Sequence, residues 1–132
     1  MLRELRRVSL RILVVEDNAL NRELVEDLLV AGGHHVECAV DGAAFYAWLR
    51  AARPVDLVVM DVGLPDSDGV TLLGALRRDR AHARVPAVAV TAHAFQSHVD
   101  ELRAAGFDAV LTKPIDTRSF VDEMERAAGK RR

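Results

Sequence analysis

Five side chains that could bind a metal ion or a phosphate each follow a short apolar run: Glu16, Asp17, Asp61, Thr91 and Lys113. Carboxylates a few ångströms apart raise one another's pKa and destabilise a fold unless a cation neutralises them. Mg²⁺ suits such a cluster, because it binds oxygen ligands, uses one or two carboxylates and accepts phosphate oxygens. If the five side chains meet, we expect the ammonium group to pair with a carboxylate or a phosphate oxygen, and the hydroxyl to donate to another phosphate oxygen.

Parallel strands would bring these side chains together, and five runs of the sequence are predicted to be strands. Four are short, mostly continuous and rich in β-branched residues, as in strands covered by helices on both faces: 12–15, 57–60, 87–90 and 109–111. The fifth, 35–40, alternates, with Val36, Cys38 and Val40 on one face, which is typical of an edge strand. We expect Cys38 to face inward as a small packing residue.

Segments with helical periodicity separate the strands. The first has leucines at 20, 24 and 28, in a stripe widened by Val25 and Leu29, with Asn18 as its cap and Gly32-Gly33 as its end. Four more helices are predicted from these residues: Phe45, Trp48 and Leu49 after the cap Asp41; Val70, Leu73 and Leu76 within 69–80; Phe95, Val99 and Leu102 before Gly106; and Phe120, Val121, Met124 and Ala128 after the cap Asp116. Five alternating β-α units wind into an open sheet that binds ligands at the carboxyl ends of its strands.

Composition narrows the class of protein. The chain has 132 residues, enough for one domain, and its net charge of −2 gives no field for direct nucleic-acid binding. No apolar run approaches the ~20 residues that span a bilayer, and no signal peptide is recognisable, so we expect no membrane insertion. Cys38 is the only cysteine, which fits a reducing, cytoplasmic location. We expect a domain over residues 10–129, an N-terminal extension over 1–9 and a basic tail over 130–132.

Four motifs at predicted strand ends together resemble the signatures of the bacterial response-regulator receiver family: Val-Glu-Asp-Asn at 15–18, Met-Asp-Val-Gly-Leu-Pro at 60–65 with Gly69, Val-Thr-Ala at 90–92 and Thr-Lys-Pro-Ile at 112–115. The resemblance runs from about Arg11 to Ala128. It implies an α/β, flavodoxin-like three-layer sandwich, with a five-stranded parallel sheet in the order 2-1-3-4-5 and five helices.

The resemblance also implies roles for the site residues. Asp61 would accept a phosphoryl group from a histidine kinase or a histidine phosphotransfer protein. The ligands of Mg²⁺ or Mn²⁺ would be Asp17, Asp61 and the Gly63 backbone carbonyl, with Glu16 acting through water. Lys113, before a cis bond to Pro114, would hold the phosphate. Thr91, Ala92, His93 and Val110 would form the switch and partner face.

One position departs from the family pattern. The usual switch couples the threonine to an aromatic residue three positions before the lysine, and here that position is Val110. Two readouts stay open: backbone shifts after the fourth strand, or binding of a partner in both states. His93 could steer a hydrolytic water, but we favour a solvated polar residue at a helix start.

The implied output is protein contact, because no DNA-binding or dedicated enzymatic domain is recognisable. We expect a downstream protein target, and a monomer or weak dimer through the fourth helix and fifth strand. The starting Met1 and the basic tail favour a stand-alone regulator over a receiver cut from a hybrid kinase. The alternative is a phosphorylation-independent scaffold. A phosphatase resembling haloacid dehalogenases is disfavoured, because Gly63 stands where such enzymes need an acid. We expect His34 and His35 to be surface residues, and His82 and His98 show no ligand spacing.

Overall fold

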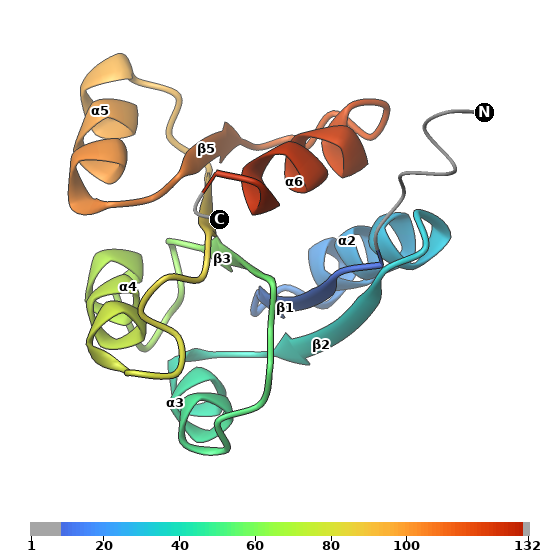
Figure 1. Ribbon diagram of the computed structural model, residues 1–132. Coiled ribbons are helices and arrows are strands. Elements are labelled where there is room, and N and C mark those ends of the chain that lie inside the picture. The colour runs from blue at the N-terminus through green and yellow to red at the C-terminus, as the bar shows by residue number, and fades with distance from the viewer. Residues whose placement is uncertain (1–8, 131–132) are drawn as a thin grey trace.

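A computed structural model describes residues 9–130, so most of the predicted N-terminal extension and basic tail lies outside the described residues. Five parallel strands form one sheet in the order β2-β1-β3-β4-β5, as predicted (Figure 1). The strands are β1 (Arg11–Val15), β2 (His35–Ala39), β3 (Leu57–Asp61), β4 (Ala87–Thr91) and β5 (Ala109–Thr112). The helices are α2 (Ala19–Ala31), α3 (Gly42–Arg50), α4 (Gly69–Arg78), α5 (Gln96–Ala105) and α6 (Phe120–Ala128).

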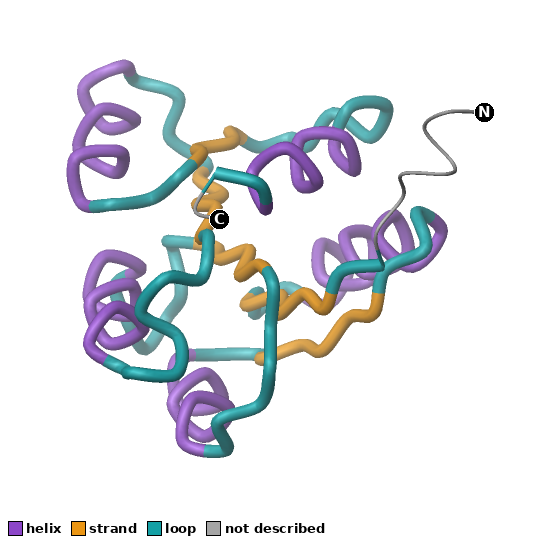
Figure 2. Tube along the Cα trace, viewed as in Figure 1, coloured by secondary structure: helices purple, strands orange, loops and turns teal. Residues whose placement is uncertain are grey.

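The helices lie in two layers, one on each face of the sheet (Figure 2). Helices α2 and α6 cover one face, where Leu29, Phe120 and Met124 pack on Ile12 and Val59. Helices α3, α4 and α5 cover the other face through a second cluster, which includes these buried residues: Leu13, Phe45, Met60, Leu72, Leu73 and Leu102. Burial on both faces explains why β3 and β4 are apolar along almost their whole length.

The predicted caps of the first two helices are confirmed. The side chain of Asn18 accepts a hydrogen bond from the backbone N–H of Asn21, and that of Asp41 accepts one from Ala44. Gly33 follows α2 with a φ of 92°, a conformation that favours glycine. The cap predicted for the last helix is wrong. Ser119 precedes α6, and Asp116 instead accepts from the N–H of Arg118 in the preceding turn.

Several predicted core positions are exposed. Leu20 and Leu24 are 76% and 39% exposed, because α2 packs against the sheet through Val25 and Leu29. Exposed fractions are also high for Val40 (46%), Val70 (41%) and Phe95 (77%). An apolar residue at helical spacing is buried only if its part of the helix faces a neighbour. Within residues 9–130, no element covers these five side chains enough to bury them.

Cys38 is also exposed, so the prediction that it packs inward is wrong. It lies on the edge strand β2, and its Sγ atom approaches a carboxylate oxygen of Glu26 at 3.8 Å. Partial burial and this carboxylate raise the pKa of the Cys38 thiol to about 11. The thiol is therefore protonated at neutral pH.

His34 is buried, although the sequence predicts a surface residue. Its Nδ1 atom accepts a hydrogen bond from the N–H of Leu10 (3.0 Å), and its Nε2 atom lies 2.8 Å from a carboxylate oxygen of Glu125. The turn after α2 places the ring between the start of β1 and helix α6. His34 thereby satisfies a backbone donor that the core would otherwise leave unpaired.

The two adjacent histidines give a test of this burial. His34→Ala removes the partner of a buried N–H and opens a cavity, so we expect the free energy of unfolding to fall by about 2–3 kcal/mol. His35→Ala, at an exposed position, is the matched control and should change it by less than about 0.5 kcal/mol. Urea denaturation measures both. Equal losses in the two variants would contradict the structural role of His34.

Candidate functional site

The register of the sheet places the predicted site residues side by side. Val15 pairs with Met60, so the next residues, Glu16 and Asp61, leave neighbouring strands at the same level. Asp61 in turn pairs with Val90, and Thr91 pairs with Thr112, which Lys113 follows. All these residues therefore lie at the carboxyl edge of the sheet, where open α/β folds bind ligands.

Three carboxylates meet at this edge. Glu16, Asp17 and Asp61 each offer an oxygen, and these oxygens all lie within 4.8 Å of one another. Glu16 and Asp61 are buried, whereas Asp17 is exposed. A close set of carboxylate oxygens with one open side fits a hard divalent cation such as Mg²⁺, which keeps several water ligands.

Lys113 lies in contact with two of the carboxylates. Its Nζ atom is 2.9 Å from Asp61 Oδ2 and 3.3 Å from Glu16 Oε1. Its backbone N–H donates to the carbonyl of Thr91 (2.8 Å), which fixes the strand end, and the bond to Pro114 is cis, as the resemblance implies. The ammonium group thus neutralises part of the negative charge.

Burial and charge act differently on the two buried carboxyls. Burial and a hydrogen bond with Asp61 raise the pKa of Glu16 to about 7. Burial also disfavours the charged form of Asp61, but hydrogen bonds from Gly63, Lys113 and Glu16 hold its pKa below the usual value. Burial alone would lower the pKa of Lys113, yet contact with Asp61 and Glu16 raises it. Glu16 therefore keeps its proton to a higher pH than an ordinary glutamate, whereas Asp61 loses its proton at a lower pH than an ordinary aspartate.

Backbone contacts hold the cluster in place. The N–H of Gly63 donates to Asp61 Oδ1 at 2.8 Å, and the N–H of Asn18 donates to Glu16 Oε2 at 3.1 Å. Sequence reasoning missed Arg22, whose guanidinium donates to the carbonyls of Glu16 (3.0 Å) and Asp17 (3.3 Å). Its place in the second turn of a helix that starts directly after the acidic pair was the available signal.

The predicted switch residues occupy different environments. Thr91 is buried, and its Oγ1 atom accepts from the N–H of His93 (3.1 Å) and lies 3.1 Å from Nε2 of His98. Ala92 and His93 are exposed, while Val110 is half-buried and packs against the core beneath α3, α4 and α5. Sequence reasoning missed His98, because no metal-ligand spacing marks it.

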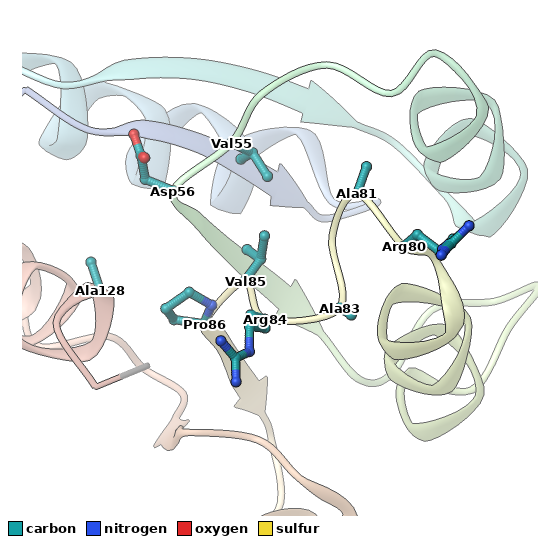
Figure 3. A pocket seen from close by; sticks show the side chains of 9 residues that line it. All are labelled: Val55, Asp56, Arg80, Ala81, Ala83, Arg84, Val85, Pro86 and Ala128. Carbon is teal, nitrogen blue, oxygen red and sulfur yellow. The ribbon is translucent and has the colours of Figure 1, made fainter. Parts of the chain in front are cut away.

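A cavity of about 330 Å³ opens at the opposite end of the sheet (Figure 3). It lies beside the amino ends of β3 and β4, where Asp56 and Pro86 line it together with Arg84 and Ala128. None of the predicted site residues is among those that line it. The acidic cluster and this cavity are therefore separate features of the structure.

The family match and the similar proteins of known function agree with each other. Residues 12–125 match the family described as response regulator receiver domain. The polar-differentiation response regulator DivK of Brucella anthropi is 32% identical over 118 residues, which cover 89% of this chain and 95% of DivK. Within residues 9–130, no helix is both long and apolar enough to cross a membrane.

Solved structures agree in fold. The receiver domain of a sensor histidine kinase from Pseudomonas aeruginosa, solved with a magnesium ion coordinated in its active site cleft, is 30% identical with a TM-score of 0.80. That match covers 93% of this chain and all of the other. The chemotaxis response regulator CheY4 of Vibrio cholerae is 25% identical with a TM-score of 0.81, over 91% of this chain and 99% of CheY4.

The raised pKa of Glu16 predicts a pH dependence of stability without divalent ions. The folded state holds this proton more tightly than the unfolded state, so the contribution is complete below about pH 4.5 and is lost as pH rises through about 7. Glu16→Gln keeps a neutral side chain at every pH. We expect the variant to lack this decline and to exceed the wild-type free energy of unfolding by about 1 kcal/mol above pH 7.

Urea unfolding in the presence of a chelator, across this pH range, measures the effect. Glu23→Gln removes the same charge from an exposed position on α2 and serves as the matched control. In this control, the free energy of unfolding should decline with pH as it does in wild type. If the free energy of unfolding of Glu16→Gln also declines with pH as in wild type, Glu16 holds no such proton.

Proposed function

Because the chain belongs to the response regulator receiver domain family of two-component systems, we propose that it accepts a phosphoryl group on Asp61 in a reaction that needs Mg²⁺. One observation carries the proposal. A buried carboxylate with a lowered pKa lies within 4.8 Å of two other carboxyls and within 2.9 Å of an ammonium group. This arrangement offers an ionised nucleophile beside the charges that a phosphoryl group requires.

Mg²⁺ fits the donor set of the cluster, and Mn²⁺ prefers similar oxygen ligands. Asp17, Asp61 and the Gly63 carbonyl would bind the ion directly, and Glu16 would act through water. When bound, the ion neutralises the carboxylates and the developing charge on the phosphoryl oxygens. The magnesium ion in the related Pseudomonas aeruginosa receiver domain supports this assignment.

The chain's own residues account for the transfer. A carboxylate oxygen of Asp61 attacks the phosphorus of a phosphohistidine. The P–N bond breaks, and its electron pair stays on the imidazole nitrogen of the donor. The raised pKa of Lys113 keeps its ammonium group charged. This group pairs first with the Asp61 carboxylate and then with a phosphoryl oxygen. Thr91 donates its hydroxyl proton to another phosphoryl oxygen.

The donor would be a sensor histidine kinase or a histidine phosphotransfer protein, and the output would be contact with a downstream protein. We assign the partner face to α5 and β5, with Thr91, Ala92, His93 and Val110 as its switch positions. The domain would span residues 10–129 and work in the cytoplasm as a monomer or weak dimer. It would be a signalling module without direct nucleic-acid contact and not a dedicated enzyme.

Phosphorylation by a small donor tests the proposal. Wild type incubated with acetyl phosphate and Mg²⁺ should gain the mass of one phosphoryl group, measured on the intact protein, and should gain none when a chelator replaces Mg²⁺ from the start. Asp61→Asn should gain none, because an amide is not a nucleophile here. Asp66→Asn is the matched control, since Asp66 lies in the loop that follows β3 but accepts hydrogen bonds from Gly42 and Ala43.

Asp66→Asn should behave as wild type does. An adduct on Asp61→Asn would place the phosphoryl group elsewhere. No adduct on wild type at any Mg²⁺ concentration would favour the alternative, a scaffold that acts without phosphorylation.

A further inference from the structure

We propose that His98 is a positioning residue that holds the Thr91 hydroxyl in the unphosphorylated protein and competes with the phosphoryl group for its proton. The inference rests on the proposed function, since it needs Thr91 to donate to a phosphoryl oxygen. The observation behind it is the 3.1 Å contact between Thr91 Oγ1 and His98 Nε2 across the start of α5.

The competition follows from the number of protons on a threonine hydroxyl. The group has one O–H proton and two lone pairs. Thr91 Oγ1 already accepts from the backbone N–H of His93 at 3.1 Å. We assign the His98 proton to Nδ1, so that Nε2 accepts the Thr91 proton across the 3.1 Å contact. A proton committed to His98 cannot be donated to a phosphoryl oxygen at the same time.

His98 also links the N-terminal end of α5, which has no side-chain cap, to the sheet. Phe95 precedes α5, its side chain provides no capping hydrogen bond, and it is 77% exposed. The buried residue of α5 is Leu102, in the second half of the helix. In the first turns, the half-buried His98 reaches the buried Thr91 at the end of β4, and its ring meets that of His93 edge-on at 5.4 Å.

This contact gives phosphorylation a route to the helix surface that needs no aromatic ring at position 110. When Thr91 turns its proton to the phosphoryl group, His98 loses its partner and the first turns of α5 lose their link to β4. Coupling is reciprocal, so whatever holds His98 on Thr91 weakens phosphoryl binding by the same factor. The exchange requires no rotation of the Val110 side chain, which is stiff and packs on the core.

A double-mutant cycle with beryllofluoride, a non-covalent phosphoryl mimic, tests the competition in the full chain with Mg²⁺. His98→Phe keeps a ring but removes the acceptor nitrogen, so the Kd for beryllofluoride, measured by NMR titration, should fall about fivefold. In a Thr91→Val background, the same substitution should leave the Kd unchanged. His35→Phe, at an exposed position on β2, is the matched control and should have no effect in either background.

Wild-type protein supplies a second measurement that does not depend on the folding of any variant. The ¹⁵N shifts of the His98 ring should show Nδ1 protonated and Nε2 accepting, and the Nε2 resonance should move when beryllofluoride binds. A proton on Nε2 before addition, or an equal effect of His98→Phe with and without the Thr91 hydroxyl, would overturn the inference. Failure of wild type to bind beryllofluoride would instead overturn the proposed function.

Discussion

Repulsion among three carboxyl groups at one edge of the sheet is the constraint to which the site is adapted. Glu16 and Asp61 are buried next to each other, with Asp17 at the open side. Two features make this tolerable in the described structure: the ammonium group of Lys113 contacts both buried carboxyls, and Glu16 retains a proton to about pH 7. Negative charge remains in excess, which is the condition for attracting a divalent cation.

The fold and the cluster could be predicted from the sequence because both depend on local patterns. A short apolar run that ends in a polar residue marks a buried strand and its carboxyl end, as at Asp61 and Thr91. Alternation with helices then requires parallel strands with neighbouring ends. Once the strand order is given, the register leaves no freedom for where Glu16 and Lys113 lie.

What the sequence could not predict depends on partners from distant elements. His34 is buried because Leu10 and Glu125 supply its hydrogen bonds, and neither is marked by spacing. Likewise, the importance of His98 follows only from its contact with Thr91, which the sequence does not reveal. Leu20 fits a helical stripe but is exposed, since no element of the part of the chain that the structure describes covers that turn of α2. Periodicity indicates which face of a helix is apolar, whereas tertiary packing decides how much of that face is covered.

Calorimetric titration of Mg²⁺ into the wild-type protein, in two buffers that differ in ionisation enthalpy, tests the central claim most directly. At a pH just below 7, the account predicts saturable binding accompanied by proton release, because the ion displaces the proton that Glu16 holds beside Asp61. Absence of binding would contradict the claim that this acidic edge is a cation site, and binding without any proton release would contradict the claim that Glu16 holds a proton beside Asp61.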